Sequence, residues 1–166
     1  MTIAQMLVPE FDHEMATTRT LLERVPENAA EWKPHAKSMS MGHLASHIAS
    51  MPGWVDQILT ESEIDFATPA AARLATPKFE STRALVEMFD RNVATARSRI
   101  AATSDADMGL SWALRNGEHK VFAMPRAAVV RSFIMSHMIH HRGQLSVYLR
   151  LRDVPLPSIY GPTADS

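Results

Sequence analysis

The sequence contains no cysteine, and this absence excludes several kinds of chemistry at once. Without thiols there can be no disulfide bond, no thiolate metal ligand and no cysteine nucleophile. A chain of this kind fits a reducing compartment. The first residues, MTIAQMLVPEF, also lack the positive region followed by an apolar stretch that marks a signal peptide. We therefore expect a cytoplasmic protein.

Long apolar runs and an excess of charge of one sign are also missing. No run reaches the roughly 18 apolar residues needed to cross a membrane. The 17 basic and 18 acidic residues give a net charge of −1, which favours neither a nucleic-acid partner nor an anionic membrane surface. The GxSxG, Walker, GxGxxG and HExxH motifs are absent as well, so the sequence does not match the enzyme classes that these motifs mark.

What is present fits one globular domain. The chain has 166 residues, of which 46% are hydrophobic and 21% charged. This length allows a sizeable core to form without disulfides or structural metals, and the composition argues against disorder. We expect a single domain that spans residues 1–166.

Four amphipathic segments with start or stop signals predict four helices. Thr2 and Gln5 are spaced as in a capping box, Ser40 and Thr76 are good N-cap residues, and Pro77 suits a first helical position. Pro52, followed by glycine, should kink or break the second helix, because proline removes one helical hydrogen bond. The four helices are expected at about 3–25, 41–61, 77–102 and 125–152.

Between the third and fourth helices, the segment 110-LSWALRNGEHKVFAM-124 predicts a short β-hairpin. Asn116 and Gly117 form the dipeptide most typical of a tight hairpin turn, since both residues tolerate positive φ. Together with the four amphipathic stripes, this predicts an all-α fold, a four-helix bundle that carries one short β-hairpin.

Histidines are concentrated in the stretch 135-MSHMIHH-141, within the fourth predicted helix. His137 and His141 are separated by four residues on the apolar stripe, so both imidazoles can reach one ion. A second pair with the same spacing, His43 and His47, lies on the helix expected to face it. Helical bundles build metal sites from such inward-facing side chains, and three histidine ligands leave positions open for water or substrate.

A simpler interpretation is that these histidines are hydrogen-bonded core residues or surface residues. His140 lies about 60° around the helix from His137 and is not expected to be a ligand. The remaining side chains considered are expected to be solvated or at the rim: His13, His35, His119, Arg142 and the carboxylates Asp12, Glu14, Asp56, Glu87 and Asp90. Any of these carboxylates could accept a hydrogen bond from a ligand histidine.

Two segments, 42-GHLASHIASMPGW-54 and 137-HMIHHRGQLSVYLRLRDVPLPSIYGPTAD-165, closely resemble the DinB superfamily of DinB/YfiT-like metalloenzymes. The resemblance implies an up-up-down-down four-helix bundle that is often dimeric. It also implies a divalent metal, zinc or nickel, held by His47, His137 and His141. His43 does not match a family ligand position, so it would bond to water near the site or lie on the surface.

The same resemblance suggests a reaction, because its members include thiol transferases that use bacillithiol and isomerases that use mycothiol. We expect a metal-dependent enzyme acting on a small molecule, with transfer of a low-molecular-weight thiol preferred over hydrolysis. The alternative is a non-catalytic, stress-associated metal-binding bundle, for which a fourth ligand such as His43 would argue. A homodimer formed through the first and fourth helices and the tail that carries Tyr160 is a further expectation. Catalytic and thiol-binding residues are not identifiable from the sequence.

Overall fold

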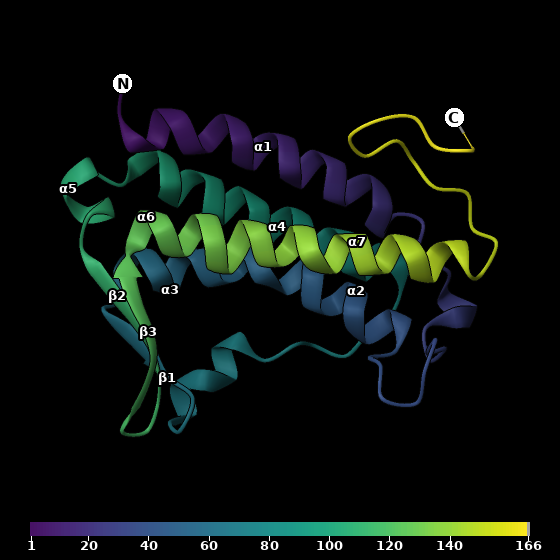
Figure 1. Cartoon of the computed structure of the whole chain (residues 1–166), viewed down its shortest axis with the longest axis horizontal. Coiled ribbons are helices and arrows are strands. Elements are labelled where there is room, and N and C mark those ends of the chain that lie inside the picture. The colour runs from purple at the N-terminus through teal and green to yellow at the C-terminus, as the bar shows by residue number, and fades with distance from the viewer. Residues whose placement is uncertain (166) are drawn as a thin grey trace.

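The protein is largely helical, with a small sheet at one end of the helices (Figure 1). The computed structural model describes residues 1–165. Helical runs appear in the four predicted regions and lie side by side (Figure 1). Their parts are α1 (Ile3–Leu22), then α2 (Met41–Ser50), η2 (Met51–Gly53) and α3 (Trp54–Thr60), then α4 (Thr82–Ala102), and finally α6 (Arg126–Val129), η4 (Val130–Ser136) and α7 (His137–Arg150).

The first two runs begin and break where their sequences indicate. The Thr2 side chain accepts a hydrogen bond from the Gln5 N–H while the Gln5 side chain accepts one from the Thr2 N–H, which completes the capping box. The Ser40 hydroxyl caps α2 by accepting from the His43 N–H. At Pro52 the helix tightens into the 3₁₀ turn η2, because proline cannot donate the next α-helical hydrogen bond.

The start of the third run differs from the prediction. α4 begins at Thr82 with Ser81 as its N-cap, and Thr76 lies outside the helix in the connection that precedes it. The Thr82 hydroxyl donates to the Val25 carbonyl at 2.6 Å, so a contact with the chain just beyond α1 holds the beginning of α4. The predicted cap at Thr76 was wrong because a local cap signal cannot register this tertiary contact.

α1 and α4 run in opposite directions. Thr82 at the start of α4 bonds to Val25 just after the end of α1. At the other end, the Ile3 N–H of α1 donates to the Asp105 carboxylate just after α4, at 2.8 Å. α4 thus runs antiparallel to α1 along its whole length.

The run formed by α2 and α3 has the same direction as α4. Asn92 Nδ2 donates to the Ala49 carbonyl, and further along both runs Arg99 pairs with Asp56. Two consecutive parallel helices require a connection that returns along the bundle, and residues 61–81 provide it (Figure 1).

The last run is parallel to α1, since Arg131 pairs with Glu10 and Arg142 pairs with Glu14. The directions are therefore up, down, down and up, which corrects the expected up-up-down-down order. The physical reason is that residues 23–40 stay at the end of the bundle where the first run ends. There the Val25 carbonyl accepts from Thr82, and the Ala30 carbonyl accepts from the Gly42 N–H at the start of α2.

A three-stranded sheet covers one end of the helices, so the fold is not purely α. β2 (Ser111–Asn116) pairs antiparallel with β3 (His119–Pro125), and Gly117, with φ of 61°, opens the turn between them. Asn116 itself stays in the strand rather than adopting positive φ. The sequence analysis missed β1 (Glu63–Asp65), which pairs parallel with β2 through residues that lie about 50 positions apart. The short elements η1 (Glu27–Ala29), η3 (Pro69–Leu74) and α5 (Asp105–Met108) complete the chain.

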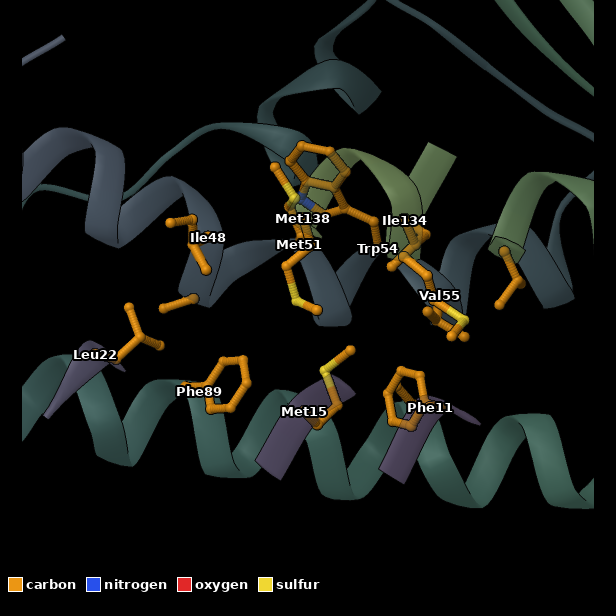
Figure 2. Close-up of a cluster of buried hydrophobic side chains, with 14 of the residues drawn as sticks. Phe11, Met15, Leu22, Ile48, Met51, Trp54, Val55, Phe89, Ile134 and Met138 are labelled. Carbon is orange, nitrogen blue, oxygen red and sulfur yellow. The ribbon is translucent and has the colours of Figure 1, made fainter. Parts of the chain in front are cut away.

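The core lies between the helical runs and includes side chains from each of them (Figure 2). Figure 2 shows Phe11 and Met15 of α1 and Phe89 of α4 along one side of the core, with Ile48 of α2 and Met138 of α7 along the other. All five side chains are almost fully buried, and such burial is the main favourable term in folding. Within residues 1–165, no helix is long and apolar enough to cross a membrane.

Candidate metal centre

Three histidines from two helical runs meet inside the bundle, between α2 and α7. His47 comes from the last turn of α2, and His137 and His141 come from the first turns of α7. One ring nitrogen from each lies within 4.8 Å of the other two, and this is the only such grouping of histidine and acidic side chains in the described chain. The three residues expected to be ligands are thus brought together.

The rings face one another closely. The Nε2 atoms of His137 and His141 are 2.9 Å apart, and the His47 ring centroid is 5.4 Å from that of His137 and 4.8 Å from that of His141. The i, i+4 spacing produces the first contact, because such side chains stack along one face of a helix. The antiparallel packing of α2 against α7 produces the other two.

The His141 and His47 rings are each held by a polar side chain at the Nδ1 atom, on the side away from the centre. His141 Nδ1 lies 2.7 Å from Gln144 Oε1, and His47 Nδ1 lies 2.9 Å from Thr76 Oγ1. An amide oxygen can only accept, so His141 carries its proton on Nδ1 and leaves a lone pair on Nε2, toward His137. Thr76, expected to cap a helix, instead orients a candidate ligand. The carboxylates considered in the sequence analysis do not serve this purpose.

Burial keeps the three imidazoles uncharged. It is the largest influence that lowers the pKa of His47 to about 4, with the neighbouring His141 and His137 rings adding to it. The pKa values of His137 and His141 are lowered as well, chiefly by burial. Neutral imidazole is the form that binds a metal, so the folded chain presents the ligands in their binding state near neutral pH.

Aromatic side chains enclose the histidines at the end nearer the sheet. The Trp54 ring lies 5.6 Å from the His47 ring and stacks at 5.8 Å on Phe133, which in turn lies 5.8 Å from His137. Apolar rings of this kind restrict the access of water and lower the local dielectric constant.

The other histidines stay outside the grouping. His43 is exposed and is not among the converging residues, and the His140 ring lies 5.0 Å from that of His141 but is also exposed. His13 stacks on Tyr160, and the His35 ring accepts a hydrogen bond from the Lys37 N–H. The expectation that His140 is not a member of the site agrees with this placement.

Next to the histidines lies a buried ionic network that sequence reasoning missed. Arg142 is 1% exposed rather than solvated, and its Nη1 lies 2.7 Å from Glu14 Oε2 of α1. Thr18 and the tail residue Tyr160 complete the network, with the Tyr160 hydroxyl 2.8 Å from a Glu14 carboxylate oxygen. The expected surface positions of Arg142 and Glu14 were wrong. The only available signal was the position of both residues on otherwise apolar stripes.

The three imidazole donors fit a divalent transition-metal ion of borderline softness. Three imidazole nitrogens around such an ion, each about 2.0–2.1 Å from it, stand roughly 3.4 Å from one another. The observed separations lie on both sides of this value, so small ring movements would bring all three to one ion. The His137 Nδ1 atom is buried without a hydrogen bond of good geometry.

Comparisons with known proteins show the family and agree with the fold. The DinB family model matches residues 2–165. The crystal structure of a DinB-like protein from Bacillus subtilis superposes with a TM-score of 0.70 at 19% identity, over 95% of this chain and 99% of that one. A DinB-like protein from Bacillus cereus gives a TM-score of 0.68 at 16% identity, over 92% and 94%. At these identities the likeness establishes the fold alone. No curated protein matches the sequence.

Proposed function

The chain belongs to the DinB family, and on that basis we propose that it is a metal-dependent enzyme with one divalent transition ion, zinc or nickel, held by His47, His137 and His141. The observation that carries this proposal is the convergence of three neutral imidazoles from two helical runs. The ring nitrogens that face one another at the centre contact neither Gln144 nor Thr76, and their burial would be costly unless a shared partner compensated them.

The residues around such an ion would bind it and orient the histidine rings. Gln144 and Thr76 hold two of the rings by their outer nitrogens, which fixes the nitrogen that faces the centre. When bound, the ion would acidify a coordinated water or deprotonate a coordinated thiol. Trp54 and Phe133 would exclude bulk water from one side of the site.

The position of His43 favours a catalytic site over a purely structural one. A structural ion is usually held by four protein ligands, and His43, the fourth histidine considered, does not join the grouping. A three-ligand centre keeps a position for a small-molecule substrate. We propose transfer of a low-molecular-weight thiol, which must come from a cosubstrate because the chain has no cysteine. Metal-assisted hydrolysis is the alternative use of the same open position.

Metal content per chain tests the centre directly. Tag-free protein, measured by inductively coupled plasma mass spectrometry, should contain about one equivalent of a divalent transition metal. His137→Ala should lose it, whereas His35→Ala, a change in a histidine outside the grouping, should not. Absence of metal after reconstitution with zinc and with nickel would contradict the proposal.

Activity assays then distinguish thiol transfer from hydrolysis at the open coordination position. The metal-loaded protein should conjugate a low-molecular-weight thiol to an electrophile, and His141→Ala should abolish this activity. Metal binding without thiol-dependent turnover, but with hydrolytic activity, would favour the alternative. The homodimer and the cytoplasmic location stay predictions, which light scattering and cell fractionation would check.

A further inference from the structure

A second polar site lies at the sheet end of the helices, around Arg126. This arginine begins α6 and is only 9% exposed. Its Nη2 donates to the Glu61 carbonyl at 2.8 Å, and its buried Nε has no hydrogen-bond partner. None of the ion pairs formed within residues 1–165 includes it. A buried guanidinium with neither a carboxylate nor a full set of acceptors is costly.

Arg126 lines a cavity of about 300 Å³ where α3, α4, α5 and α6 meet. Arg99 lines the same cavity, but Asp56 already neutralises its charge at 2.6 Å. The hydroxyls of Thr60 and Thr103 donate to backbone carbonyls, so toward the cavity they can only accept.

The remaining charged group in the cavity wall is Asp107. Its carboxylate accepts a hydrogen bond from the Ser104 hydroxyl at 2.7 Å and makes no ion pair with Arg126. The cavity therefore combines an unpaired guanidinium, which donates, with acceptors: one carboxylate and two hydroxyl oxygens. A fully deprotonated oxyanion satisfies the guanidinium but meets repulsion at Asp107.

We propose that this cavity binds a hydrogenphosphate ion. Its unprotonated oxygens suit the fork of N–H donors on Arg126, and its P–OH group can donate to Asp107 or to a threonine oxygen. Sulfate has the same shape but carries no proton near neutral pH, so Asp107 selects against it. The site is separate from the histidine centre, since the eleven positions from Arg126 to His137 correspond to roughly 15 Å of helix.

Calorimetric titration of the full chain with inorganic phosphate and with sulfate tests the proposal, with the ionic strength held constant by chloride. Phosphate should bind at one site per chain, at least about tenfold more tightly than sulfate. Arg126→Met should weaken phosphate binding about tenfold or more, the loss expected when charge-assisted hydrogen bonds are removed. Arg24→Met, which removes an exposed arginine that forms none of the ion pairs described, should change nothing.

Two further variants make the result specific to this cavity. His137→Ala should retain phosphate binding, which excludes coordination of the anion to a metal at the histidine centre. Asp107→Asn alters an exposed side chain and should remove most of the preference for phosphate over sulfate. This second test stays available if Arg126→Met fails to fold.

Thermal unfolding provides an independent check. Phosphate at about 100 times its dissociation constant should raise the Tm of the parent chain by about 5–10 °C and that of Arg126→Met by no more than about half as much. Equal affinity for phosphate and sulfate, or an affinity for phosphate that is unchanged in Arg126→Met, would overturn the proposal.

Discussion

At the scale of single residues, the three histidines of the candidate metal centre are held uncharged by burial, and this makes stability depend on pH. The pKa of His47 is about 4 in the folded chain, against 6.5 for an unperturbed histidine. Between these values the unfolded chain binds a proton that the folded chain does not bind. The free energy of unfolding of the metal-free protein should therefore fall by on the order of 1–3 kcal/mol as the pH drops from 6.5 toward 4.

Urea titrations of the metal-free protein across this pH range would measure the effect. His47→Asn should flatten the dependence, because the variant has one titrating group fewer. An unchanged slope in the variant would show that other groups cause the loss of stability.

The polar side chains behind the ligands should tune metal affinity. Gln144→Leu removes the acceptor at His141 Nδ1, so the ring loses the bond that fixes its orientation and its tautomer. The metal dissociation constant should rise about 10- to 100-fold, as measured by competition with a chromophoric chelator. Val147→Ala on the exposed side of the same helix is the control and should leave the affinity unchanged.

Residue spacing predicted part of this centre and could not predict the rest. The four-residue spacing of His137 and His141 follows from helix geometry alone, so that pair was visible in the sequence. Thr76 was not, because its contact with His47 joins positions 29 residues apart and depends on how the connection before α4 returns. The burial of Arg142 against Glu14, 128 residues away, is a tertiary property of the same kind.

At the scale of elements, two glycines in helices should respond oppositely to alanine. A Cβ on Gly42 would stand 3.0 Å from the Phe79 side chain and 3.1 Å from Ala30, so α2 and its neighbouring connections would have to separate. Gly42→Ala should lower the free energy of unfolding by about 1–3 kcal/mol.

Gly143→Ala provides the matched comparison. A Cβ on Gly143 meets no atom within 4 Å, so the variant should gain about 0.5–1 kcal/mol from better helix propensity. Urea denaturation of both variants would measure the difference. Destabilisation of both proteins alike would contradict the importance of the close approach at Gly42.

Two elements, η4 and β1, could not be predicted from the periodicity of hydrophobic residues. The apolar stripe of the last run predicted one continuous helix, but η4 is a π-helix that ends at Ser136, immediately before the candidate ligand His137. Such wide turns are favoured by packing and occur often at functional sites, and no local propensity marks them. β1 was missed for a similar reason, since three residues are too few to show alternation.

At the scale of the whole molecule, the pair Arg142–Glu14 joins the first helix, the last helix and the tail. The Tyr160 hydroxyl donates to Glu14, and burial together with this bond raises the pKa of Tyr160, so the hydroxyl stays protonated. Glu14→Gln would leave Arg142 buried without its counter-charge, and the free energy of unfolding should fall by about 3–5 kcal/mol.

An exposed pair that joins α1 to α4 serves as the control. Asp12→Asn breaks the contact with Arg97, in which both side chains are well exposed, and should cost at most about 1 kcal/mol. Equal losses in the two variants, measured by chemical denaturation, would show that burial does not distinguish the two pairs.

The order of the helices along the chain has a consequence for biosynthesis. α7 supplies two of the three histidines and leaves the ribosome after the other three helical runs. A nascent chain that has released only its first three helical runs holds His47 alone, too few ligands for a stable complex. Under the proposed function, metal is therefore loaded only after α7 has emerged, and a chain truncated before His137 cannot compete for a scarce ion with chains that carry α7.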